Sequence, residues 1–109
     1  MGSPVSIVRT SEFPGGLKDS ISDALNKIDF KPSGSIRTVV IKPNLMYYWD
    51  SSTGNTTDPK LVSAIIDYVR EKFGEDVSIK VAEADASAMR TKYVFPVLGY
   101  DRLAAEKNV

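Results

Sequence analysis

The sequence predicts an α/β fold in which crossover helices cover a largely parallel sheet in three layers. Strand-like and helix-like segments alternate along the whole chain, and successive strand-like segments lie far enough apart for a helical crossover between parallel strands. The length of 109 residues is that of one ordinary domain, and the 42% of apolar residues is typical of globular proteins. We therefore expect a single α/β domain over residues 1–109.

Three segments are expected to form strands. Val5–Thr10 is rich in β-branched residues, alternates loosely between apolar and polar, and is followed by turn-forming residues. Thr38–Lys42 contains a continuous apolar run, as expected for a central strand that is covered on both faces. Val77–Ala82 alternates more regularly. Their order, with a helical segment between each pair, predicts parallel strands joined by right-handed crossovers.

Two amphipathic helices are expected between these strands. In Leu17–Ile28 the apolar residues recur at helical spacing and the charged residues face away. Pro59–Phe73 shows the same pattern more clearly and has both boundary signals. Asp58 precedes it as an N-cap residue, its first position is proline, and Gly74 follows its last apolar residue.

The last part of the chain is expected to hold two short helices. Pro96 limits the first to a turn or two, and Gly99 ends it. Asp101 is expected to cap a final helix that runs through Lys107. The alternation then calls for another strand at the point where the chain ends. We therefore interpret the chain as the N-terminal portion of a longer protein and as a truncated α/β domain.

Composition excludes several classes of function. The 14 Lys and Arg residues balance the 14 Asp and Glu residues and are interspersed with them, so a nucleic-acid-binding surface is not expected. The chain contains neither Cys nor His, which removes disulfides, zinc sites and cysteine-bound iron–sulfur clusters and leaves any cofactor unknown. No apolar run is long enough for a membrane span or a signal peptide, so the expected location is cytoplasmic.

The first candidate site lies beyond the second strand. Ligands of parallel sheets bind beyond the carboxyl ends of the strands, where Lys42 and Asn44 offer a cation and an amide. Thr56, Thr57 and the amides that open the helix at Pro59 complete a candidate site for a carboxylate or phosphate. In the alternative interpretation, Lys42 extends into solvent and Asn44 only satisfies a turn.

A second candidate loop follows the third strand. Glu83, Asp85 and Ser87 lie within a few residues of one another, and with Asp50 or Asp58 the two acids have the oxygen chemistry of a Mg²⁺ site. Acidic loop residues are more often solvated or helix-capping, so we predict no metal site.

An aromatic cluster occupies the middle of the long loop. Tyr47, Tyr48 and Trp49 are suited to stacking on a flat ligand or to covering the site as a lid. The alternative is that they pack against the sheet edge or against another domain.

Several of these segments together resemble the domain of unknown function 362 family. The resemblance rests on Lys42-Pro43-Asn44-Leu45, the Thr57-Asp58-Pro59 stretch, and the residues from Val81 to Asp85 and from Val94 to Tyr100. It covers the chain from about Thr38 to Val109. The family's customary His in the Thr-x-Pro stretch is replaced here by Asp58. Proteins of that family are longer, often carry four-iron four-sulfur ferredoxin-type modules, and have no generally assigned activity.

Two hypotheses about function follow. In the first, the chain is a small-molecule or cofactor-binding α/β domain with an anionic ligand, linked to redox chemistry through the ferredoxin-type modules that the resemblance implies. In the second, it is a non-enzymatic scaffold or protein-interaction domain. The partners considered are an anionic small molecule, a missing C-terminal part or ferredoxin-type module, and a second copy in a homo-oligomer. Whether the protein is an enzyme is left open.

Overall fold

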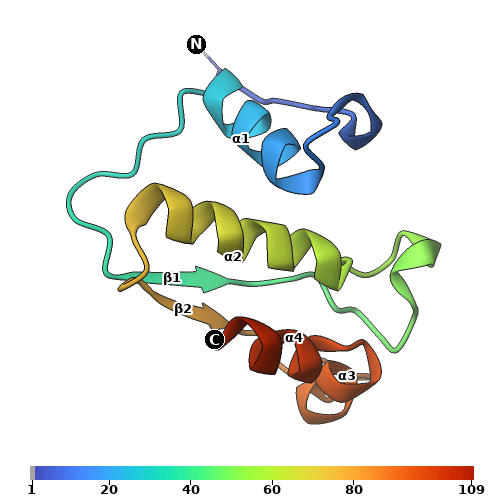
Figure 1. Cartoon of the computed structure of the whole chain (residues 1–109). Coiled ribbons are helices and arrows are strands. Elements are labelled where there is room, and N and C mark those ends of the chain that lie inside the picture. Colours follow the sequence, from blue (N-terminus) through green and yellow to red (C-terminus); the bar gives the residue numbers. More distant parts are fainter. Residues whose placement is uncertain (1) are drawn as a thin grey trace.

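A computed structural model describes residues 2–109 and confirms the α/β class (Figure 1). Two strands, β1 (Thr38–Ile41) and β2 (Ser78–Val81), form a parallel sheet. The helices are α1 (Leu17–Lys27), α2 (Pro59–Phe73), α3 (Thr91–Val97) and α4 (Tyr100–Lys107). Two short 3₁₀ turns, η1 (Thr10–Glu12) and η2 (Ser51–Thr53), lie in the loops. The second and third predicted strands thus form and pair in parallel, with α2 as their crossover.

The predicted strand at Val5–Thr10 is wrong. Residues from Gly2 to Arg9 have no strand pairing, and Thr10 already belongs to η1. Instead, the hydroxyl of Ser6 donates to the carbonyl of Ala24 in α1 at 2.6 Å. A β-branched, alternating segment becomes a strand only when another strand satisfies its backbone groups, and within residues 2–109 none is placed beside this one.

The helices begin and end close to where the sequence predicts. α2 matches Pro59–Phe73, with the Asp58 side chain accepting from the Lys60 amide at 2.9 Å and Gly74 at φ 106° after its last residue. The start of α4 differs from the prediction. Gly99, in the left-handed conformation, takes the cap position, and Asp101 lies within the first turn.

The core lies between one face of the sheet and α2. Val39 and Ile41 of β1 are in register with Ile79 and Val81 of β2, and all four are at least half-buried. They pack against a row of buried α2 residues, namely Val62, Ile66 and Val69. Met89, Val94, Tyr100 and Leu103 extend the core towards the C-terminus.

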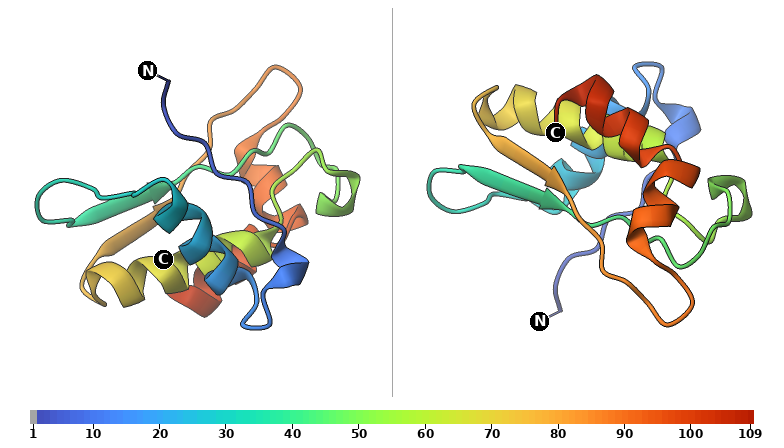
Figure 2. Two further views of the ribbon diagram at one scale, coloured as in Figure 1. Left: turned by 90° about the horizontal axis from the view of Figure 1, so that it is seen from above. Right: turned by 90° about the horizontal axis from the view of Figure 1, so that it is seen from below.

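The other face of the sheet is open in the described residues. Thr38, Val40, Ser78 and Lys80 are exposed there, with Val40 retaining 60% of its accessible surface. Figure 2 shows α2 and α4 lying together on one side of the strands. β1 is therefore covered on one face, although its apolar run predicted cover on both. A third layer remains a prediction.

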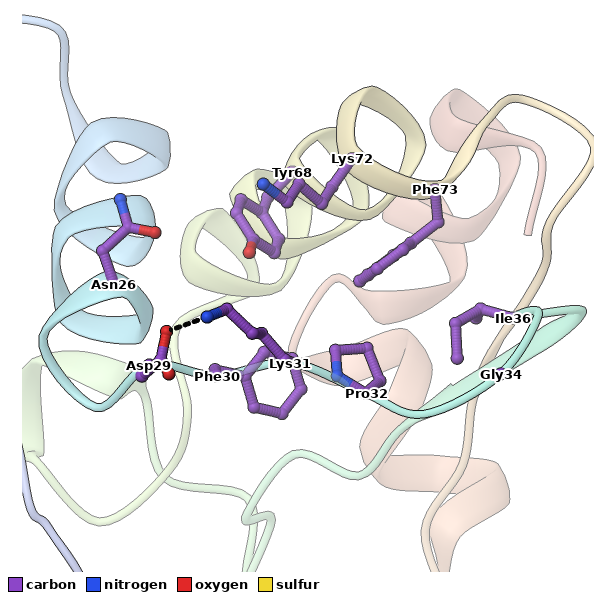
Figure 3. Close-up of a pocket in the computed structure, with 10 residues that line it drawn as sticks. All are labelled: Asn26, Asp29, Phe30, Lys31, Pro32, Gly34, Ile36, Tyr68, Lys72 and Phe73. Carbon is purple, nitrogen blue, oxygen red and sulfur yellow. Dashed lines mark ion pairs between the residues drawn. The ribbon is translucent and has the colours of Figure 1, made fainter.

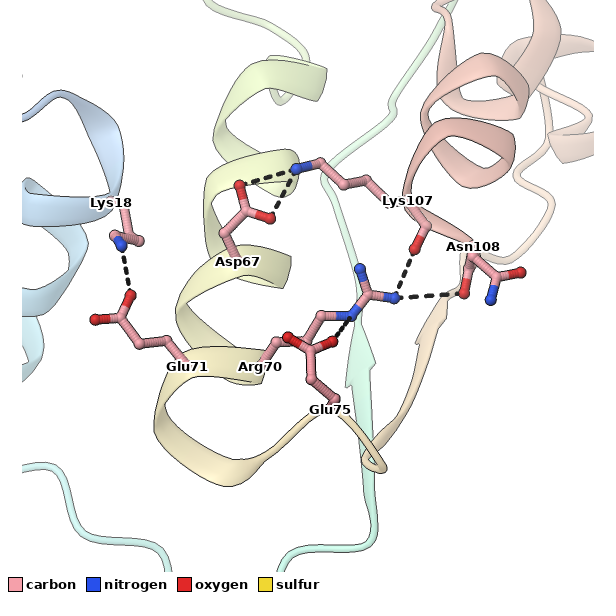
Figure 4. A network of polar contacts seen from close by, with 7 residues as sticks. All are labelled: Lys18, Asp67, Arg70, Glu71, Glu75, Lys107 and Asn108. Atoms are coloured by element: carbon pink, nitrogen blue, oxygen red, sulfur yellow. Dashed lines mark hydrogen bonds and ion pairs between the residues drawn. The ribbon is translucent and has the colours of Figure 1, made fainter.

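Ion pairs on the outer side of α2 connect it to both neighbouring helices (Figure 4). Glu71 pairs with Lys18 of α1, and the Asp67 carboxylate accepts from the Lys107 ammonium of α4 at 2.7 Å. The guanidinium of Arg70 also donates to the Lys107 carbonyl. α2 is thus the central helix, with α1 on one flank and α4 on the other.

Candidate functional site

The candidate site is built at the carboxyl ends of β1 and β2. The two strands are parallel and in register from Thr38 with Ser78 to Ile41 with Val81, so the residues that follow them emerge at the same edge. Lys42 comes directly after β1, and Glu83 lies two residues after β2. The topology therefore brings together the two loops that the sequence singled out separately.

Lys42 and Glu83 form an ion pair across this edge. The Lys42 ammonium lies 3.1 Å from Oε1 of Glu83. The two partners differ in environment, because the Lys42 side chain is 69% exposed whereas that of Glu83 is only 8% exposed. The pair therefore presents its positive end to solvent above a buried carboxylate.

Backbone amides hold the Glu83 carboxylate in place. Oε1 accepts from the Ala84 amide at 2.8 Å, and Oε2 accepts from the Leu45 amide at 3.4 Å. Burial works to raise the pKa of Glu83, but the Ala84 amide, the Lys42 ammonium and the Leu45 amide outweigh it, so this pKa lies below its usual value. Glu83 is consequently a fixed anion between the two loops.

Asn44 fixes the start of the long loop. Its backbone amide donates to Oγ1 of Thr57 at 2.9 Å, and its carbonyl accepts from the Thr57 amide at 2.9 Å. Its side-chain amide donates to the Asn55 carbonyl at 3.1 Å. Asn44 and Thr57 are therefore brought together next to the start of α2, as the geometry of a crossover requires. Their hydrogen bonds are made within the loop, however, and they hold its base closed.

Thr56 has a structural contact inside the same loop. It is only 7% exposed, and its hydroxyl donates to the Trp49 carbonyl at 2.8 Å. Leu45 and Thr56 form an isolated antiparallel bridge at the base of the loop. Of the four residues proposed as the anion site, Lys42 is the one with a charged side chain, which is 69% exposed and pairs with Glu83.

The loop after β2 is closed by a second ion pair. Asp85 accepts from the Thr91 amide at 2.8 Å and from the Arg90 guanidinium at 3.1 Å, and these two groups lower the pKa of Asp85. A bridge between Ala86 and Met89 tightens the turn, and Ser87 is exposed at its tip. Asp85 thus organises the turn that leads into α3.

The two other acids considered for a cation have structural partners. Asp50 accepts from the Ser52 amide at 2.9 Å, which lowers the pKa of Asp50, and Asp58 caps α2. Both carboxylates therefore cap a helical segment by accepting from a backbone amide in its first turn.

The aromatic residues form a small cluster on the long loop. The Tyr47 ring lies 4.8 Å from that of Tyr48 and 5.3 Å from that of Trp49, measured between centroids. Tyr48 packs against the core, while Tyr47 and Trp49 are 38% and 47% exposed. One ring of the cluster therefore packs inward and two remain at the surface, and the role as a stacking platform or lid stays a prediction.

Tyr100 is a contact that the site analysis of the sequence missed. Its hydroxyl donates to the Thr57 carbonyl at 2.8 Å and joins α4 to the segment that precedes α2. Burial, reinforced by the nearby Asp58 carboxylate, raises the pKa of Tyr100 to about 12. The sequence feature that could have drawn attention to Tyr100 is the Gly99-Tyr100 pair, which contributes to the family resemblance.

Residues 39–109, about two thirds of the chain, match the family model described as Domain of unknown function (DUF362). The chain belongs to the domain of unknown function 362 family. The match confirms the predicted family and contains every residue of the candidate site. No curated protein and no solved structure matches the chain. In the part of the chain that the structure describes, no helix has both the length and the apolar character needed to span a membrane.

Proposed function

We propose that this domain of unknown function 362 chain binds an anionic small molecule at the carboxyl edge of its sheet. The observation that carries the proposal is the Lys42–Glu83 pair, in which a largely exposed ammonium is anchored by a buried carboxylate. A lysine ammonium has three N–H donors, and Glu83 engages one face of the group. The remaining donors are available to a carboxylate or phosphate oxygen.

The acids at this edge define the ligand further. Glu83 offsets the charge of Lys42, and Asp85 offsets that of Arg90, so a bare anion gains little from the local field. A ligand that also carries a hydroxyl or amino donor gains a hydrogen bond to one of these carboxylates. Small polar acids such as hydroxy acids fit this arrangement better than inorganic phosphate does.

Calorimetric titration with a panel of small hydroxy acids and with inorganic phosphate tests the proposal. We expect Lys42→Ala to weaken binding of a hydroxy acid by roughly tenfold to a hundredfold, the range for losing a charged hydrogen-bond partner. Lys80→Ala is the matched control, because Lys80 is an exposed lysine in the middle of the neighbouring strand. Equal affinities in wild type and Lys42→Ala would contradict the proposal.

The redox-linked form of this proposal places the electron carrier outside the 109 residues. Without Cys or His, the chain offers none of the usual ligands for an iron–sulfur cluster. A Cys-x-x-Cys-x-x-Cys run after Val109 in the parent gene would support a ferredoxin-type module as the partner, and its absence would weaken the redox link.

The second candidate function, a protein-interaction domain, is favoured by the surface of the long loop. Met46 is 61% exposed beside the exposed rings of Tyr47 and Trp49. Trp49 is the single tryptophan, so its fluorescence reports on this surface directly. A spectral shift when a hydroxy acid binds supports a lid over the small-molecule site, whereas a shift only with a protein partner supports the interaction domain.

A further inference from the structure

One edge of β1 has no strand beside it in the part of the chain that the structure describes. The carbonyls of Arg37 and Ile41 accept from the amides of Ser78 and Ala82, so these alternate residues face β2. In a parallel pair the residues between them direct their N–H and C=O groups to the opposite side. Thr38 and Val40 therefore offer backbone donors and acceptors at an open edge, which is where a further strand can pair.

An apolar groove runs beside this open edge. It has a volume of about 520 Å³ and lies between β1, α1 and α2. Its walls include Ile21, Leu25, Phe30, Ile36, Val40 and Phe73. Figure 3 shows the adjoining cleft, where Phe30, Pro32 and Ile36 lie across from Phe73. A groove of this composition takes apolar side chains, and the β1 edge beside it takes an extended backbone.

The chain itself carries a segment with matching properties. Val5 and Ile7 are 85% and 90% exposed, whereas the alternate residues Ser6 and Val8 are partly buried. The segment therefore alternates as a strand does, with one apolar face that nothing in the described chain covers. It runs along α1, held by the Ser6 hydroxyl on the Ala24 carbonyl, and does not pair with β1 (Figure 1).

Topology shows where such a segment fits. α1 packs on α2 and leads into β1. A strand that precedes α1 and is joined to β1 by a right-handed crossover lies next to β1, on the edge away from β2. That position is the open edge beside the groove. The Val5–Arg9 segment thus has the residue pattern that the vacant strand position beside β1 requires, although the segment does not occupy that position within one chain.

We propose that two copies of this chain exchange their Val5–Arg9 segments, each segment pairing in parallel with β1 of the other copy. Val5 and Ile7 then enter the partner's groove beneath α1 and α2. The exchange is reciprocal, so the two copies form a closed twofold dimer in which the open β1 edge of each copy is paired. The hinge is the Phe13–Gly16 turn, where Gly16 adopts φ 85°, a value that disfavours other residues.

Light scattering coupled to size exclusion tests the exchange on the full chain. We expect wild type to have twice the mass of one chain. Ile7→Lys places a charge in the groove and is expected to raise the dimer dissociation constant roughly a hundredfold. Val97→Lys is the matched control, because Val97 is 64% exposed on α3 and takes no part in the exchange. A monomeric wild type, or a dimer that Ile7→Lys leaves unchanged, overturns the proposal.

Crosslinking distinguishes exchange from closure within one chain. Because the chain lacks cysteine, Ile7→Cys and Val39→Cys each introduce a single thiol, and Val39 lines the groove on the same face of the sheet that Ile7 would enter. A short bismaleimide added to an equal mixture of the two variants should give a heterodimer of twice the chain mass. If the double variant at high dilution instead crosslinks within one chain and remains monomeric, the segment occupies its own groove, and the exchange is wrong. Far-UV circular dichroism confirms that each variant is folded.

Discussion

Replacing Glu83 by alanine is expected to destabilise the fold much more than replacing its ion-pair partner Lys42 by methionine. The Glu83 side chain is 8% exposed and accepts from the Ala84 amide at 2.8 Å. It also accepts from the amide of Leu45, a residue that is 1% exposed. Removing the carboxylate leaves the Leu45 N–H buried without its acceptor.

The two substitutions differ in magnitude because the two side chains differ in exposure. A hydrogen bond to a charged acceptor contributes about 1.5 to 3 kcal/mol, and an orphaned buried donor adds to its loss. We therefore expect Glu83→Ala to lower the free energy of unfolding by about 3 kcal/mol. The Lys42 ammonium is 69% exposed, so solvent screens the ion pair and Lys42→Met should cost at most about 1 kcal/mol.

Urea unfolding followed by circular dichroism measures both losses, and its pH dependence gives a second readout. The pKa of Glu83 is lowered in the folded state, so its contribution is present above the ordinary value of 4.5 and is lost as the pH falls through the lowered folded-state pKa. Glu83→Gln should remove this part of the acid sensitivity. Equal losses for Glu83→Ala and Lys42→Met, or a loss below about 1 kcal/mol for Glu83→Ala, would refute the reasoning.

Two further predictions concern the core and α4. Ile66 is fully buried on α2, so Ile66→Ala should lower the free energy of unfolding by about 2 to 5 kcal/mol in the same urea assay, whereas a loss below 1 kcal/mol would show that the site is loosely packed. In a spectrophotometric titration, one of the five tyrosines should ionise near pH 12, and Tyr100→Phe should abolish that step. Because the pKa of Tyr100 is raised in the folded state, its contribution to stability is complete below the ordinary value of 10.0 and is lost as the pH rises through about 12.

The parts of the fold that depend on local chemistry could be predicted from the sequence. α2 begins and ends as expected because Asp58, the proline at its first position and Gly74 act within a few residues of the helix. The pairing of β1 with β2 follows from the helix between them. The failed strand at Val5–Thr10 has suitable residues, but its state depends on a partner strand that local pattern does not reveal.

Sequence reasoning located the segments that meet at the carboxyl edge of the sheet, but only some of the contacts between them. Parallel topology correctly brought Lys42 and the loop after β2 to one edge. It did not specify that Lys42 would pair with Glu83, because that choice depends on the buried position of the carboxylate and on the Leu45 amide. Asn44 and Thr56 were expected to face a ligand, yet their side chains donate to loop carbonyls, which are closer competing acceptors.

The bridge between Leu45 and Thr56 closes the base of the long loop. The bonds between Asn44 and Thr57 reinforce this closure. Tyr48 packs on the core, and Trp49 and Asn55 accept hydrogen bonds at the base, so residues 50–54 are the part that can change in number without moving β1 or α2. Doubling the length of such a closed loop costs only about 0.6 kcal/mol in chain entropy. Evolution can therefore lengthen, shorten or rewrite this segment at small cost, and relatives that share the same scaffold can differ most at the tip of this loop.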